Sequence, residues 1–268
     1  MLIDTHCHLT FAPLRDQVTD VLARARAADV RQVINVATTI AEARAGLELL
    51  RSFPEVDLVA GIHPHEAGHC TSDDLAALAA LHRGEWAEQA DAERLVGVGE
   101  TGLDFHYDFA PRARQEEVFR FHLALAVQVG RPVVIHARAS ELRVCEMLAD
   151  YPQLAGRVVF HCFSAGVDIA RRVLDLGGYL SFTGVVTFKK AETVRAAARF
   201  APQDRILVET DAPYLSPEPV RKTQPNEPAF VVHTARFLAE LRGESLDELA
   251  GATTANAIRC FGLPKESA

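Results

Sequence analysis

Histidines and carboxylates stand where short apolar segments of this sequence end, and together they could bind metal ions. His6 and His8 form an H-x-H pair. Residues i and i+2 of a strand point to one face, so both imidazoles can meet at one ion while Cys7 points away. The remaining candidate ligands are Glu100, His136, His161 and Asp211. Imidazole with carboxylate is the ligand set of Zn²⁺, Mn²⁺, Fe²⁺ or Co²⁺.

Each of these residues also has an ordinary structural explanation. A lone H-x-H pair arises by chance, His136 and His161 could be core histidines bonded to the backbone, and Glu100 could cap the next helix. Together, those explanations require four histidines and two carboxylates to end strands by coincidence. Six ligands are too many for one catalytic ion with an open position. We therefore predict two ions that share a bridging carboxylate, about 3.5–4 Å apart.

Eight apolar, β-branched segments must position these side chains. They are Leu2–Cys7, Val30–Ala37, Val56–Ile62, Leu95–Glu100, Pro132–His136, Val158–His161, Tyr179–Phe182 and Ile206–Glu209. Continuous apolar strands are buried on both faces, as in a parallel sheet. Helical patterns lie between them, over Thr71–Leu78, Gln115–Val129, Asp168–Leu176, Ala191–Phe200 and Phe230 to about Phe261.

This alternation predicts an α/β fold, a (β/α)₈ TIM barrel, with residues 1–268 as one domain. The rival is an open, doubly wound sheet. A barrel brings the carboxyl ends of all its strands to one mouth, whereas an open sheet spreads them along a wide edge. Because the polar residues collect at strand ends, we favour the barrel.

Composition narrows the function further. The chain has 268 residues and a formal net charge of −8, which opposes non-specific binding to nucleic acid. A phosphate-bearing substrate remains possible, since bound metal ions are strong local positive charges. Five cysteines without a C-x-x-C motif indicate reduced thiols. With no signal-peptide pattern and no long apolar stretch, we expect a cytoplasmic protein without membrane contact. The sequence makes no prediction of oligomeric state.

Six ordered motifs resemble one known family. They are Ile3–Leu9 (IDTHCHL), Gly61–His65 (GIHPH), Gly97–Asp104 (GVGETGLD), His136–Arg138 (HAR), His161–Ser164 (HCFS) and Leu207–Leu215 (LVETDAPYL). They resemble the TatD family of metal-dependent deoxyribonucleases, within the amidohydrolase-like barrel superfamily, along nearly the whole chain. Ser140 and Ala165 depart from it, since the family usually has an acidic residue and a glycine there; the segment after Pro217 also differs somewhat.

The resemblance implies a role for each matching residue. His6, His8, Glu100 and Asp211 would hold the first metal. Glu100 would bridge to a second metal, and the remaining ligands of that metal would be His136 and His161. Asp211 would also help to activate the attacking water. The residues expected to contact substrate are His63, His65, Arg138 and Tyr214.

The chemistry would suit an anionic ester. Metal ions lower the pKa of bound water from about 15.7 toward ~7 and neutralise phosphate oxygens. Asp211 could accept the proton of the water, with Glu100 as the shared ligand. His63 could bond the phosphate, protonate the leaving oxygen, or be a rim histidine with no catalytic part.

Other charged and aromatic side chains fall in the loops at the same mouth. The cations are Arg112, Arg114, Arg138, Lys189, Lys190, Arg221 and Lys222. They could guide a nucleic-acid backbone or simply be solvated. The aromatic residues are Phe105, Tyr107, Phe109 and Tyr214. They could stack bases or fill the lid of the barrel.

The favoured function is a two-metal deoxyribonuclease acting on single-stranded DNA or on strand ends, with two divalent ions drawn from Zn, Mn, Co, Fe or Mg. An alternative is a hydrolase of other esters or amides, such as an aminoacyl-ester on RNA, at the same metal site. A third possibility is a binding module with an ancestral metal site. The complete ligand set counts against this last function.

Overall fold

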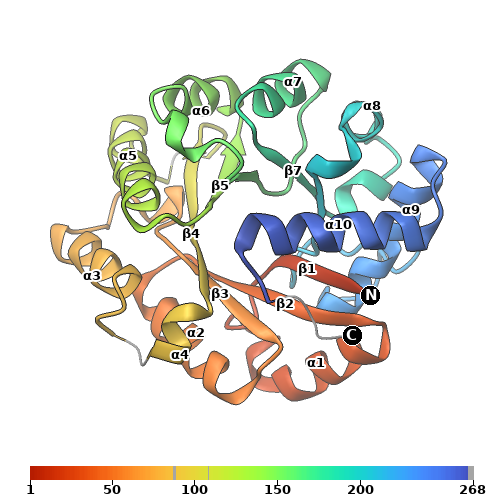
Figure 1. Cartoon of the computed structure of the whole chain (residues 1–268), viewed down its shortest axis with the longest axis horizontal. Helices are drawn as coiled ribbons and strands as arrows, with labels where there is room; N and C mark the ends of the chain where they lie inside the picture. Colours follow the sequence, from red (N-terminus) through yellow and green to blue (C-terminus); the bar gives the residue numbers. More distant parts are fainter. Residues whose placement is uncertain (87–88, 108, 265–268) are drawn as a thin grey trace.

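Eight parallel strands in sequential order form the centre of the molecule (Figure 1). The computed structural model describes residues 1–86, 89–107 and 109–264. The strands are β1 (Leu2–Cys7), β2 (Val30–Ala37), β3 (Val56–Ala60), β4 (Leu95–Asp104), β5 (Val133–Arg138), β6 (Val158–Phe160), β7 (Tyr179–Phe182) and β8 (Ile206–Val208). The predicted α/β barrel is confirmed, and each strand falls on one of the eight apolar segments.

The sheet closes where β8 meets β1. Cys7 and Ala212 form a parallel bridge across this seam. The backbone N–H of Asp211 donates to the carbonyl of His6 at 2.9 Å, and that of His8 donates to the carbonyl of Ala212 at 2.8 Å. An open sheet would leave these groups at opposite edges, so the rival architecture is excluded.

Helices surround the strands (Figure 1). They are α1 (Val18–Ala27), α2 (Ile40–Ser52), α3 (Ser72–His82), α4 (Gln89–Glu93), α5 (Arg112–Val129), α6 (Glu141–Leu148), α7 (Val167–Asp175), α8 (Glu192–Phe200), α9 (Val231–Arg242) and α10 (Leu246–Phe261). Thr71 and Asp74 form a capping box that begins α3. None of the helices in the described part of the chain combines the length and apolar character needed to cross a membrane.

The single helical stretch predicted from Phe230 to about Phe261 is wrong, because two helices occupy it. Gly243 ends α9 in a left-handed conformation, with φ of 71°. Ser245 and Glu248 then form a second capping box, which begins α10. Glycine at the end of one helix and a capping serine two residues later make a break more stable than a continuous helix.

Helix α10 closes one end of the barrel. Its Cys260 and Phe261 pack against inward-facing strand residues such as Ile3, Val96 and Leu207. The Asn256 side chain donates to the carbonyl of Ile206, the first residue of β8, at 2.8 Å. Because α10 blocks the amino-terminal ends of the strands, a ligand must enter at their carboxyl ends.

Strand β4 is longer than the predicted Leu95–Glu100 and extends to Asp104. Gly99, near the end of the predicted segment, and Gly102, in the extension, both have φ of 134°. A Cβ atom at Gly102 would lie 2.1 Å from the carbonyl oxygen of His136, so only glycine allows β4 and β5 to approach so closely. The extension places Asp104 beside Arg138 of β5.

Candidate metal centre at the barrel mouth

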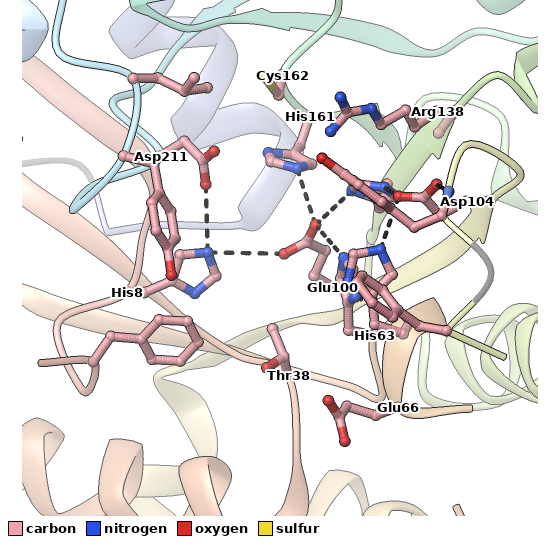
Figure 2. A pocket seen from close by; sticks show the side chains of 18 of the residues that line it. His8, Thr38, His63, Glu66, Glu100, Asp104, Arg138, His161, Cys162 and Asp211 are labelled. Atoms are coloured by element: carbon pink, nitrogen blue, oxygen red, sulfur yellow. Dashed lines mark hydrogen bonds and ion pairs between the residues drawn. The ribbon is translucent and has the colours of Figure 1, made fainter. Parts of the chain in front are cut away.

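A cavity of about 920 Å³ opens at the carboxyl ends of the strands. Figure 2 shows side chains from opposite sides of the barrel pointing into it. Nine of the ten predicted site residues line the cavity, namely His8, His63, His65, Glu100, His136, Arg138, His161, Asp211 and Tyr214. His6 lies directly beneath, buried, and contacts His8 and Glu100. The tertiary structure therefore brings together residues that are dispersed through the sequence.

One group of donors lies on the β1 and β8 side of the cavity. His6 Nε2 lies 3.3 Å from His8 Nε2, and 3.4 Å from Glu100 Oε2. His8 Nε2 lies 3.4 Å from Asp211 Oδ1. A tetrahedral ion with bonds of roughly 2.0–2.1 Å holds its ligands about 3.3–3.4 Å apart. These spacings fit a divalent cation.

A second group contacts the other oxygen of Glu100. Oε1 lies 3.1 Å from His136 Nδ1 and 3.0 Å from His161 Nε2. The carboxylate of Glu100 thus lies between two pairs of histidines, with one oxygen directed to each pair (Figure 2). This is the arrangement that a bridging ligand of two ions requires.

The second ring nitrogen of three of these histidines is held by another group. His8 Nδ1 donates to the carbonyl of Val36 at 3.1 Å. His136 Nε2 donates to Asp104 Oδ2 at 3.0 Å, and His161 Nδ1 donates to Glu209 Oε1 at 3.1 Å. Bonds of this kind fix the tautomer and orientation of a metal-binding histidine and raise its basicity. Each ring therefore directs its other nitrogen to the interior of the site, where that nitrogen would bind an ion.

Asp104 and Glu209 are two functional residues for which the sequence predicted no role. Asp104 is fully buried, and its Oδ1 accepts the backbone N–H groups of His106 and Tyr107. Glu209, also fully buried, accepts from the backbone N–H of Cys162 at 2.6 Å and from Ser181. Asp104 ends the GLD of β4, and Glu209 directly follows the last residue of β8. Their position at strand ends was a signal for function, but their histidine partners depend on the folded barrel.

Asp211 is held by contacts that are distant in sequence. Its backbone φ is 57°, a left-handed value that is costly for a residue with a side chain. The preceding residue, Thr210, donates from both its backbone N–H and its hydroxyl to Asp4, at 2.9 and 2.6 Å. Asp4 belongs to β1 and Thr210 follows β8, so this contact joins the first and last strands of the barrel beneath Asp211.

The electrostatics favour a charged carboxylate at the centre. Burial alone would raise the pKa of Glu100, but the neighbouring imidazole of His161, whose own pKa is raised by Glu100 and Glu209, holds it well below its usual value. Burial opposes ionisation of Asp211 too, and the hydrogen bond from His8 overcomes it and lowers the pKa. Two buried anions among imidazoles form an environment that attracts cations.

His63 and His65 lie on the β3 side of the mouth. His63 Nε2 is 3.3 Å from Glu100 Oε1, and His65 Nε2 is 2.8 Å from Asp104 Oδ2. Burial lowers the pKa of the His63 imidazole to about 4, so the ring is neutral at pH 7. A neutral ring can hydrogen-bond a phosphate, but it is a poor donor of a proton to a leaving group.

Arg138 is the one Lys or Arg among the described residues that line the cavity. Its guanidinium lies 4.7 Å from the ring centroid of Tyr107. The other six loop cations are not among the lining residues. Three of them have contacts elsewhere: Arg112 lies over Phe105, Arg221 lies over Phe188, and Arg114 donates to the carbonyls of Ala67 and Cys70. The cavity therefore offers one cation to a substrate and not a broad basic surface.

Comparisons with known proteins agree with this geometry. A family model described as TatD related DNase matches residues 3–262. The metal-dependent hydrolase YcfH of Escherichia coli K12 is 38% identical over 266 residues, covering 98% of this chain and 96% of the relative. The 3'-5' ssDNA/RNA exonuclease TatD of Edwardsiella piscicida is 34% identical over 267 residues, covering 98% and 100%. The crystal structure of the TatD homologue YjjV of Escherichia coli K12 superposes with a TM-score of 0.90 at 30% identity, covering 98% of both chains.

Proposed function

Since the chain belongs to the TatD family of metal-dependent hydrolases, we propose that it hydrolyses phosphodiester bonds of nucleic acid at a centre for two divalent ions. The observation that carries this proposal is the position of Glu100. Its two carboxylate oxygens face separate pairs of histidines, at distances from 3.0 to 3.9 Å. A site for a single ion would not need both pairs.

Each side chain takes a role from its place in the cavity. His6, His8, Glu100 and Asp211 would hold one ion, and Glu100, His136 and His161 would hold the other. Such ions, when bound, lower the pKa of a coordinated water and neutralise charge on phosphate oxygens. Asp211 is ionised, lies at the edge of the cavity, and can accept the proton of the attacking water.

Three further side chains face the space that the phosphate would occupy. His63 and His65 offer hydrogen bonds from one wall of the cavity, and Arg138 offers two parallel N–H groups to phosphate oxygens. Donors of this kind suit an anionic substrate better than a neutral amide. Relatives from Edwardsiella piscicida and Citrobacter rodentium carry the name 3'-5' ssDNA/RNA exonuclease TatD, which supports nucleic acid as the substrate here.

A substrate panel tests the proposal. The protein, reconstituted in turn with Mg²⁺, Mn²⁺, Co²⁺, Fe²⁺ or Zn²⁺, is assayed with a labelled single-stranded oligonucleotide, an aminoacyl-ester and a cyclic amide. We expect cleavage of the oligonucleotide that EDTA abolishes. The Asp211→Asn variant should bind the oligonucleotide but cleave it far more slowly. Turnover of the ester or amide without any cleavage of the oligonucleotide would replace this function with the alternative.

We also propose that the protein works in a reducing compartment such as the cytoplasm. All five cysteines are free, and three of them are buried in the core. Unpaired thiols are typical of proteins that remain in reducing surroundings.

A further inference from the structure

Aromatic side chains are unusually exposed at the barrel mouth. Among the described residues, the aromatic side chains with large exposed areas are Tyr107, Phe109, Tyr214 and Phe200. The first three line the cavity. Single exposed apolar residues are ordinary, but several gathered around one cavity mark a surface that contacts a ligand.

Phe109 is both ordered by neighbours and open to solvent. Its ring stacks on Tyr107 with centroids 5.2 Å apart and planes 18° apart. The ring of His65 meets it at an angle of 72°, with centroids 4.7 Å apart. Phe109 is nevertheless 61% exposed. Two neighbours therefore hold the ring in place, so a ligand that stacks on it has little side-chain entropy to remove.

These rings are directly coupled to the proposed metal centre. His65, which contacts Phe109, bonds to Asp104, and Asp104 bonds to the ligand candidate His136. Arg138 lies over Tyr107 and is the single cation of the cavity lining. A phosphate held by Arg138 would thus leave the base of the same nucleotide beside the aromatic rings.

The charge of the cavity indicates how a strand is recognised. A protein that follows the backbone of a duplex needs many Lys and Arg contacts to phosphates, but this cavity supplies one cation, and the chain carries a net charge of −8. Stacking on aromatic rings is the other main source of affinity for nucleic acid. It requires a base that is free of its partner strand.

Building on the proposed nuclease function, we propose that Tyr107 and Phe109 form a stacking platform that takes an unpaired nucleobase of the strand being cleaved. The protein would then recognise an unpaired base next to the scissile phosphate, in addition to the phosphate itself. Every base has a π face, so it selects for single-stranded structure and not for sequence.

The Phe109→Ala variant tests this platform. We expect kcat/KM on a single-stranded oligonucleotide to fall about 5- to 150-fold, the range for loss of one base–aromatic stack. Phe109→Trp should retain most of the wild-type value. Phe200→Ala is the matched control, because Phe200 is an exposed phenylalanine beneath Arg171, outside the cavity lining. It should leave kcat/KM unchanged.

A second substrate separates stacking from a structural effect. An oligonucleotide of the same length, with abasic tetrahydrofuran residues around the scissile bond, has phosphates but no bases. Wild type and Phe109→Ala should cleave it at equal rates. An equal loss on both substrates, or wild-type activity of the variant on the base-bearing strand, would overturn the platform. If the wild-type protein cleaves neither oligonucleotide, the proposed nuclease function itself fails.

Discussion

Glu100 is the residue on which the histidines of the mouth converge. Oε1 lies within 3.3 Å of nitrogens on His63, His136 and His161. Oε2 faces His6, at 3.4 Å. A buried carboxylate costs free energy unless positive charge compensates for it. Among the described residues, no backbone N–H at the start of a helix donates to Glu100, so helix capping does not account for this carboxylate, and a cation is the partner that fits.

Replacement of Glu100 by Gln should weaken the binding of one of the two ions. The amide keeps the shape of the side chain but loses its charge, so we expect bound metal to fall from about two ions per chain toward one. Activity should fall at least as much as the roughly 10- to 100-fold loss that follows removal of an outer-shell partner. Metal analysis and kinetics on the reconstituted variant measure both effects.

The control is Glu66→Gln, which changes an exposed carboxylate of the same cavity. Figure 2 shows Glu66 apart from the histidine cluster. It should keep both metal content and activity. A Glu100→Gln variant with full activity would contradict the bridging role.

Arg138 should contribute to the binding and cleavage of substrate and not to the binding of metal ions. Its side chain is exposed in the cavity and forms no ion pair within the described residues. A charge-assisted contact to phosphate is worth about 1.5–3 kcal/mol, so Arg138→Ala should lower kcat/KM on a phosphodiester roughly 10- to 150-fold. Metal content and melting temperature should stay the same, as measured by elemental analysis and calorimetry.

Arg112→Ala is the matched control, because Arg112 also lies over an aromatic ring, that of Phe105, but does not line the cavity. Loss of thermal stability in Arg138→Ala would indicate instead that the residue orders its loop. Unchanged kinetics on DNA would remove it from the site.

At the level of elements, close contact between β4 and β5 positions His136, a ligand candidate for the second ion, and the carboxylate of Asp104 that orients it. Gly102 pairs with His136, and Asp104 pairs with Arg138. Helix α5 supports the same region, since Gln115 accepts from the backbone N–H of Asp104 at 2.8 Å. The carboxylate that orients His136 therefore comes from the strand beside it, at a register that the glycines permit.

Gly102→Ala should disturb this register. The new Cβ atom would meet the carbonyl oxygen of His136 at 2.1 Å, in a backbone conformation unfavourable for alanine. Overpacking and backbone strain each cost about 1–3 kcal/mol, so we expect the free energy of unfolding to fall by about 2–6 kcal/mol. Urea denaturation measures this change, and the affinity for the second ion should fall with it.

Gly251→Ala provides the comparison, since Gly251 is an exposed residue of α10 with no atom within 4 Å of a built Cβ. Alanine there should be neutral or stabilise the protein by up to ~1 kcal/mol. Equal stability of the two variants would show that β4 can relax around a side chain at position 102.

The whole molecule is one barrel in which the last helix, α10, contacts the first residue of the chain. The hydroxyl of Thr254 in α10 donates to the carbonyl of Met1 at 3.3 Å, and α10 plugs the end of the barrel opposite to the mouth. That residues 1–268 make one functional domain stays a prediction, and residues 265–268 lie outside the described part of the chain.

Acid should destabilise the scaffold through His82 and His122. Burial lowers the pKa of His82 to about 3 and that of His122 to about 4, from 6.5. Only the unfolded chain then binds protons at these residues between pH 6.5 and about 4. Their contribution is fully present above pH 6.5, and each residue removes up to about 1.4 kcal/mol of stability per pH unit as the pH falls through this window.

Urea denaturation of metal-free protein at several pH values measures how steeply the free energy of unfolding falls with pH. The His122→Gln variant keeps a donor for the Val118 carbonyl and an acceptor for the Ile62 N–H, and it should show a shallower decline between pH 6.5 and 5. Between pH 7.5 and 8.5 the slopes of wild type and variant should agree. Identical slopes in acid would contradict the contribution of His122.

Local patterns in the sequence sufficed for the strands, for the barrel and for most of the residues at its mouth. The spacing of His6 and His8 places them on one face because strand geometry repeats every two residues. Apolar runs ending in Glu100, His136 and His161, and one that ends just before Asp211, predicted one mouth because parallel strands in a barrel share a direction. Each of these inferences depends on residues close together in the chain.

Contacts between distant strands depended on the tertiary structure. His161 and Glu209 are 48 residues apart, and Asp4 and Thr210 are 206 apart. Which carboxylate orients a histidine, and which oxygen of Glu100 faces which pair, follows from strand register and barrel closure, and no local period encodes these. The same holds for Arg114 and Arg138, alike as loop cations in the sequence, because only the packed loops turn one toward carbonyls and the other into the cavity.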